Sequence, residues 1–214
     1  MSVRSDGVVR GGSNDGETRG IALNEKNEQL VAQGLPPYAE LTRLGGGFSV
    51  IQIVATAGLV VRPSTLSAIT LWNGEGSGGK SYVIDRLFTH NLVSTAAIHQ
   101  FGIWACVHPA GMTAPGVDIA ASAVNVTGNA GKLYNGRSQV GVAETVAANG
   151  WYPWGDGNQI TVVNATPGSH SSVEVAGRLI VPPGGGILLQ VLSGVTGDTF
   201  TTGLSWYEVQ LALE

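Results

Sequence analysis

Short apolar runs separated by turn residues recur along the chain from residue 48 onward. The runs are rich in Val, Ile, Thr and aromatic residues, and Gly, Pro, Asn or Ser interrupts them about every ten residues, which is typical of an all-β sandwich or barrel. No long segment has convincing helical periodicity. The predicted strands are Phe48–Ala55, Leu59–Arg62, Ala68–Trp72, Ser81–Phe88, Ala96–Val107, Val117–Val126, Gln139–Val146, Gln159–Asn164, Ser172–Val181, Ile187–Leu192 and Thr199–Leu211.

The last of these strands has one of the clearest patterns. In Thr199–Leu211 the even positions include Leu204 and Trp206 and the odd positions include Tyr207 and Val209. A strand with this apolar weight is expected to pair inside a sheet, and its truncation to destroy the fold. Because two packed antiparallel sheets would bury strands of this kind, we predict an all-β, antiparallel β-sandwich.

The first 44 residues differ from the rest of the chain. Met1–Gly20 is polar, glycine-rich and without periodicity, which is typical of a flexible arm. A possible short helix or strand between residues 21 and 33 ends at a Gly-Leu-Pro-Pro-Tyr break, and the triple glycine Gly45–Gly47 follows Leu44. We therefore predict an extended N-terminal arm over residues 1–44, joined by a glycine hinge to a β-sandwich body over residues 45–214.

Charge is sparse and unevenly placed. Only 12% of the residues are charged, about half the usual share. Residues 1–44 hold 11 of the charged residues, and the remaining 170 residues hold 15. A body with so few surface charges has little to oppose association with other proteins. Because interface cores are depleted in charge, we expect it to contact other subunits. The net charge of −4 argues against nucleic acid as the main partner.

The composition also indicates a globular protein. The hydrophobic share of 43% and mean hydropathy of +0.17 argue against global disorder. No run of about 18 apolar residues predicts a membrane span, and the N-terminus lacks the apolar core of a secretory signal. We therefore expect synthesis in the cytoplasm and no membrane partner.

One stretch, Asn73–Ser81, matches the phosphate-binding P-loop pattern Gly-x-x-x-x-Gly-Lys-Ser. The pattern binds nucleotide only between a buried strand and a helix N-terminus, with a later strand ending in a magnesium-binding carboxylate. Ala68–Trp72 supplies the strand, but after Gly79 the sequence shows neither of the other features. With 32 glycines in 214 residues, we interpret the match as a hairpin tip whose next strand starts at Lys80. A nucleotide-binding enzyme is the less favoured alternative.

The sequence shows no catalytic or metal-binding pattern. His90, His99, His108 and His170 lack the neighbouring carboxylates or histidines of hydrolase and metal motifs. Cys106 is the only cysteine, and we expect a small buried side chain rather than a nucleophile. We therefore expect no enzyme activity, no cofactor and no metal.

The densest aromatic cluster is Gly150-Trp-Tyr-Pro-Trp-Gly155. As a loop between glycines, it would present Trp151, Tyr152 and Trp154 to a protein partner or a sugar, since Trp and Tyr are favoured in binding hot spots. The alternative is that the rings cover an open end of the sandwich.

Four stretches together resemble virion structural proteins of tailed bacteriophages. They are Leu35–Gly45, Gly79–Asp85, Gly150–Gly155 and Ser205–Gln210. Proteins of that type are jelly-roll sandwiches that decorate or cement the capsid, or that form head and tail fibres.

The resemblance implies a non-enzymatic decoration or cement protein on the capsid surface of a virion. Its partners would be the major capsid protein and other copies of itself, as a homotrimer. The arm would supply adhesive contacts, with Tyr38, Leu41 and Leu44 as candidate partner-binding residues beside the aromatic cluster. The alternative is a fibre or receptor-binding module in which Trp151–Trp154 recognises host glycan.

Overall fold

The computed structural model describes residues 39–43, 45–52, 54–64, 66–108, 111–115, 123–125, 138–141, 150–161, 163 and 168–211. The chain divides into two units, Met1–Ala39 and Glu40–Glu214, and all described residues except Ala39 belong to the second. The predicted arm therefore lies almost wholly outside the described residues, as do Tyr38 and Leu44. The arm, its boundary and the partner contacts of these two residues stay predictions.

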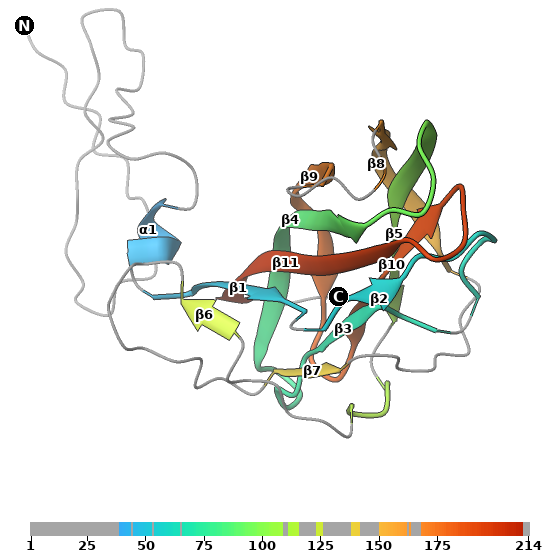
Figure 1. Ribbon diagram of the computed structural model, residues 1–214. Helices are drawn as coiled ribbons and strands as arrows, with labels where there is room; N and C mark the ends of the chain where they lie inside the picture. The colour runs from blue at the N-terminus through green and yellow to red at the C-terminus, as the bar shows by residue number, and fades with distance from the viewer. Residues whose placement is uncertain are drawn as a thin grey trace, which may run out of the picture. The chain divides into compact units, whose positions relative to one another are not determined.

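One short helix and eleven strands make up the regular structure of the described residues (Figure 1). The elements are α1 (Ala39–Arg43), β1 (Gly47–Ile51), β2 (Thr56–Ala57), β3 (Ile69–Trp72), β4 (Lys80–Val93), β5 (His99–His108), β6 (Ala123–Asn125), β7 (Gln139–Gly141), β8 (Tyr152–Ile160), β9 (His170–Val181), β10 (Gly186–Ser193) and β11 (Thr199–Gln210).

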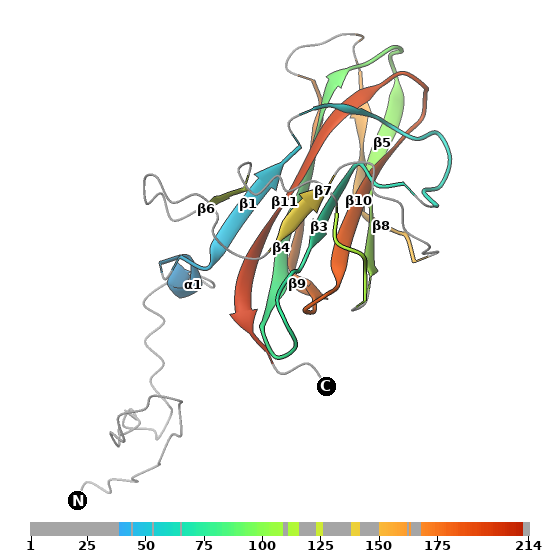
Figure 2. The same ribbon diagram turned by 90° about the horizontal axis from the view of Figure 1, so that it is seen from below.

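The strands form two antiparallel sheets in the order of a jelly roll. The six-stranded sheet runs β6-β1-β11-β4-β9, with β2 also paired to β11, and the five-stranded sheet runs β7-β3-β10-β5-β8. The pairing is nested, because β1 pairs with β11, β3 with β10, β4 with β9 and β5 with β8. Successive pairs alternate between the two sheets, which Figure 2 shows as two layers. The prediction of an all-β jelly-roll sandwich is confirmed.

The main apolar core lies between the two sheets. Trp206 of β11 is fully buried, with its ring centroid 5.8 Å from that of Phe48 on β1 and 6.2 Å from that of Tyr82 on β4. From the other sheet, β3, β5 and β10 contribute buried aliphatic side chains, among them Leu71 and Ile187. Since β11 lies between β1 and β4, the prediction that the last strand pairs inside a sheet is confirmed.

The triple glycine ends α1 instead of acting as a free hinge. The N–H of Gly45 donates to the carbonyl of Thr42, and the N–H of Gly46 donates to the carbonyl of Leu41, both at 2.9 Å. Gly45 has a φ of 81°, so the pair of bonds forms a Schellman cap, which satisfies carbonyls at the helix end. Because Gly47 is already the first residue of β1, the helix is tied directly to the sheet.

Several predicted boundaries were wrong. Leu59–Arg62 is not a strand, since only Leu59 forms an isolated bridge, to Leu192. The short strand Thr56–Ala57 was not predicted, and β4 continues five residues beyond the predicted end at Phe88. Parts of the predicted strands near residues 117–126 and 139–146 lie outside the described residues, which retain β6 and β7 there.

Candidate functional site

The P-loop match lies in a connection between the sheets, not in a nucleotide-binding loop. β3 belongs to the five-stranded sheet and β4 to the six-stranded sheet, so the predicted hairpin tip is corrected to a crossover. Lys80 is the first residue of β4, as predicted, and no helix follows in residues 80–108. Its Nζ lies 3.3 Å from Glu208 Oε2. Without a helix N-terminus, this loop lacks the feature that holds phosphate.

A buried polar network centres on Asp198, whose side chain is fully buried. Its carboxylate lies 2.5 Å from His99 Nε2 and accepts hydrogen bonds from Ser193 Oγ at 2.6 Å and from the Thr95 N–H at 2.9 Å. Burial alone would raise the pKa of Asp198, but these hydrogen bonds and the attraction of His99 outweigh it and lower the pKa.

The network is not arranged for nucleophilic catalysis. Ser193 and His99 both contact Asp198, so the serine donates to the carboxylate and not to the imidazole, whereas a catalytic serine must contact its base. Instead the network joins the β4–β5 and β10–β11 connections. Thr95 Oγ1 also donates to the carbonyl of Thr196 at 2.8 Å, and the Gly58 N–H donates to the carbonyl of Asp198 at 2.9 Å.

The described residues contain no group of three or more His, Cys, Asp or Glu side chains that could hold a metal ion. Cys106 is buried, as predicted, beside Trp151 and Leu188. Burial raises the pKa of its thiol, against a smaller lowering by a hydrogen bond with the Gly150 backbone. A buried thiol of raised pKa is a poor nucleophile.

The aromatic cluster is not the loop that the sequence suggested. It enters β8, and its rings separate. Trp151 is 2% exposed and donates from Nε1 to the carbonyl of Ser64 at 3.1 Å, while Trp154 packs against the main core. Tyr152 is 67% exposed. The three rings therefore do not form one binding surface. A partner-binding role stays a prediction for exposed Tyr152, for half-buried Trp154 and for half-buried Leu41.

A different surface collects exposed apolar side chains. We call the apical end the end of the sandwich where the β4–β5, β8–β9 and β10–β11 connections meet residues 54–61, at the upper end of Figure 2. Of ten exposed large hydrophobic side chains among the described residues, seven belong to this end. These seven, the apical surface, are Val54, Val60, Val61, Leu92, Val93, Ile98 and Val163.

The apical end also lacks charge. Residues 54–61, 92–98, 161–169 and 194–197 contain no Asp, Glu, Lys or Arg. Asp198 belongs to the β10–β11 connection at this end, but its side chain is fully buried and does not reach the surface. Exposure is high at its most prominent members, with Val54 at 72%, Val61 at 67% and Ile98 at 77%. Exposed apolar side chains that gather at one end of a protein indicate an interaction site, whereas single exposed aliphatic residues do not. Sequence reasoning missed this site, although the charge-free loops were visible in the sequence.

Comparisons with known proteins add little to this picture. No family model matches the chain, and no curated protein matches it. Among solved structures, the chain is similar to a chain in the structure of a marine algae virus of the order Picornavirales. The TM-score is 0.26 with 11% identity, over 100% of this chain and 90% of that chain. The nested strand pairing therefore carries the fold assignment. In the described part of the chain, no helix has the length and apolarity to cross a membrane.

Proposed function

We propose that this chain is a non-enzymatic structural protein of a virus particle, a decoration or cement protein that contacts neighbouring shell subunits through its apical surface. The observation that carries the proposal is the gathering of exposed aliphatic side chains at one end of the sandwich, on the last residues of β4 and on segments without charge. Burying each fully exposed Val or Ile contributes about 1.5–3 kcal/mol, and such loops present no charge to be desolvated on contact.

Hydrogen bonds join three described segments of the apical end to one another. The Asp198 network fastens the β4–β5 connection to the β10–β11 connection, and the Gly58 N–H ties residues 54–61 to the same point. Loops that are already ordered lose less conformational entropy on binding, so more of the apolar contact appears as affinity. A hydrogen-bonded, charge-free surface suits permanent contact in an assembled shell.

The sheet edges formed by β8 and β9 are poorly suited to association. β8 carries Pro153, and Gly155 has a φ of 74°. β9 carries Ala176 and Gly177, with φ values of 50° and 77°. Proline and irregular backbone on edge strands discourage pairing with another chain. Contacts through the loops are therefore favoured over extension of the sheets.

The first experiment measures the copy number of this chain in purified virus particles by quantitative mass spectrometry. A decoration or cement role predicts a fixed ratio to the major shell protein. A handful of copies per particle would instead favour a fibre, and absence from particles would refute a virion role.

The second experiment tests the apical surface. The double variant Val61→Asp with Ile98→Asp should reduce co-sedimentation with shells stripped of this chain at least about tenfold, since it places charge in the contact. Leu66→Asp is the matched control, because Leu66 is 48% exposed and lies outside the apical surface. Equal loss in both variants, or none in the double variant, would remove the apical surface from the proposal.

A further inference from the structure

A groove of about 600 Å³ lies on the outer face of the six-stranded sheet. It extends over β1, β11, β4 and β9. Small side chains form its floor, with Ser49 directly opposite Ser205 in the register of β1 and β11. Larger side chains line it, including Phe88, Arg86 and Tyr207. The volume lies within the range of about 300–1,000 Å³ that is usual for small-molecule sites.

A β-bulge in β4 places two opposite charges together in this groove. Ile84 pairs with Trp206 and Arg86 pairs with Ser205, so Asp85 has no partner on β11. Ile84 and Leu87 are both fully buried in the core, and Asp85 and Arg86 between them both line the outer groove. A regular strand would send neighbours to opposite faces. Bulges re-aim side chains in this way beside functional sites.

The neighbouring strand is distorted at the same place. The register of β4 with β9 passes from Leu179 to Glu174 across Asp85, and the extra residues of β9 include Ala176 at a φ of 50°. Arg178 Nε holds this distortion by donating to the carbonyl of Val175 at 3.0 Å. A positive φ is uncommon for alanine. The pairing of β4 is therefore irregular at Asp85 with both of its neighbours, β11 and β9.

The two charged groups retain hydrogen-bonding capacity. Asp85 Oδ2 accepts one long hydrogen bond, from Ser205 Oγ at 3.4 Å. Arg86 Nη2 lies 3.2 Å from Glu174 Oε1, and both of these side chains are well exposed. A carboxylate accepts about four hydrogen bonds and a guanidinium donates five, so both groups can bind further polar atoms.

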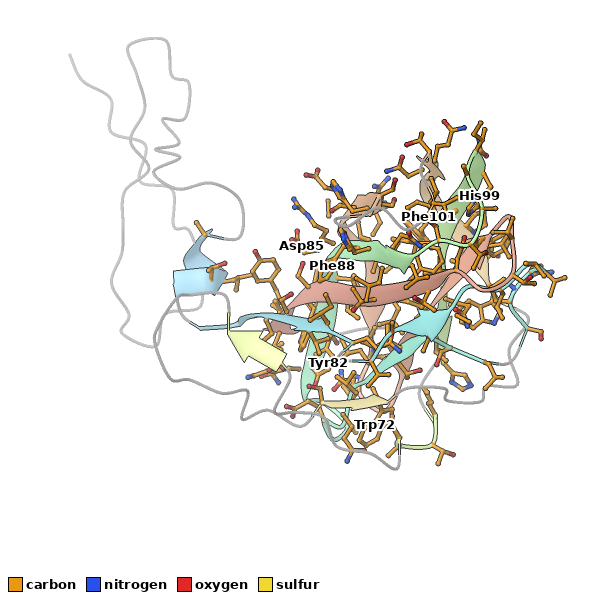
Figure 3. The ribbon with its side chains drawn as sticks, in the orientation of Figure 1. Trp72, Tyr82, Asp85, Phe88, His99 and Phe101 are labelled. Atoms are coloured by element: carbon orange, nitrogen blue, oxygen red, sulfur yellow. The ribbon has the colours of Figure 1, made fainter. Side chains whose placement is uncertain are left out.

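Phe88 supplies an apolar platform beside this pair. A Cβ on Gly203 would lie 2.4 Å from Phe88 Cε2 and 2.6 Å from its Cζ. The Phe88 ring therefore packs against the backbone of Gly203 on β11. The ring remains partly exposed in the groove. Asp85 and Phe88 come from the same stretch of β4, as labelled in Figure 3.

We propose that this groove binds a neutral saccharide. A sugar ring presents an apolar C–H face, which fits a flat aromatic ring, and a rim of hydroxyl groups that each donate and accept. Asp85 can accept hydrogen bonds from the sugar hydroxyl groups, while Arg86 and the serine hydroxyls can donate hydrogen bonds to the sugar oxygens. Because the negative charges of Asp85 and Glu174 lie beside the positive charge of Arg86, the site has no net positive charge that would favour a phosphate. The inference does not rest on the proposed virion role.

The test uses the full chain and a panel of neutral trisaccharides of glucose, galactose, mannose, rhamnose and N-acetylglucosamine. Each is screened by saturation-transfer NMR, and hits are titrated by calorimetry. At least one trisaccharide should bind. Asp85→Asn should weaken it about tenfold or more, since a hydrogen bond to a charged group contributes roughly that factor. Phe88→Ala should weaken it about tenfold or more as well, since it removes the aromatic side chain that would be buried against the sugar ring.

Two matched substitutions serve as controls. Leu92→Ala truncates an exposed apolar residue of β4 outside the groove, and Glu75→Gln neutralises a carboxylate in the β3–β4 connection. Both should bind like the unmodified chain. If no trisaccharide binds, or if Asp85→Asn binds as well as the unmodified chain, the proposal is overturned. Asp85→Asn keeps the test decisive even if Phe88→Ala fails to fold.

Discussion

Replacement of Asp198 by alanine should be among the most damaging single changes in the apical end. The carboxylate is fully buried and is contacted by Ser193 Oγ, His99 Nε2 and the Thr95 N–H. Its removal leaves these donors without their acceptor, at about 1–3 kcal/mol for each buried donor that finds no substitute. The serine hydroxyl can rotate, so we expect a loss of about 3–5 kcal/mol in the free energy of unfolding. That is a large part of the roughly 5–15 kcal/mol that stabilises a typical protein.

Urea denaturation at pH 7, followed by tryptophan fluorescence, measures this loss. Asp198→Asn is the matched variant, because it keeps the shape and one acceptor oxygen but removes the charge, and its loss should be smaller. A loss below about 1 kcal/mol for Asp198→Ala would refute the reasoning, since it would mean that water or other groups replace the carboxylate.

The pH dependence gives an independent check. The folded-state pKa of Asp198 is lowered, so its stabilising contribution is present above the unfolded-state pKa of about 3.9. It is lost as the pH falls below that value through the folded-state pKa. The stability difference between the unmodified chain and Asp198→Asn should therefore shrink as the pH falls below about 4. A difference that grows as the pH falls below that value would contradict the assignment.

Four further predictions concern other parts of the sandwich. Trp206→Ala should lower the free energy of unfolding by about 3–5 kcal/mol in urea, because the fully buried ring leaves a cavity. Gly203→Ala should lower the free energy of unfolding by about 1–3 kcal/mol or more, because its Cβ would lie 2.4 Å from the carbonyl oxygen of Val50. Gly76→Ala is the control, since its Cβ would meet no atom within 4 Å, and its free energy of unfolding should change by no more than about 0.5 kcal/mol in the same assay. Cys106 should react with a thiol reagent only after denaturant is added, as absorbance of the released product would show. Calorimetric titration with ATP and magnesium should give no binding heat, because the P-loop match at Lys80 begins a strand; saturable binding would reopen the nucleotide-binding interpretation.

The periodic pattern was sufficient to predict the fold class but not its irregular parts. Apolar runs in Ile187–Leu192 and Thr199–Leu211 reflect burial in a sheet, so burial could be inferred before any pairing was known. The pairing itself joins residues far apart, such as Phe48 with Trp206, and local pattern contains no information on it. Jelly-roll order was predicted from strand number and resemblance, and only the nested register demonstrates it.

The candidate sites were harder to predict, for physical reasons that differ between them. Trp151 and Trp154 are three residues apart, yet one ring packs with Cys106 and the other against the main core, so the cluster could not act as one surface. His99 and Asp198 meet because two connections converge on one end of the sandwich. The charge pair in the groove depends on a bulge at Asp85 that no sequence signal marks.

The two proposed surfaces lie on different parts of the sandwich, so the structure allows them to be separated. The apical surface lies at one end of the sandwich, on connecting segments and the last residues of β4, whereas the groove lies on the outer face of the six-stranded sheet. Val61→Asp with Ile98→Asp should weaken shell binding at least about tenfold and leave trisaccharide binding unchanged. Asp85→Asn should weaken trisaccharide binding about tenfold or more and leave shell binding unchanged. If one variant weakens both activities equally without unfolding, the two surfaces share a partner. The groove would then be part of the shell contact and not a separate sugar site.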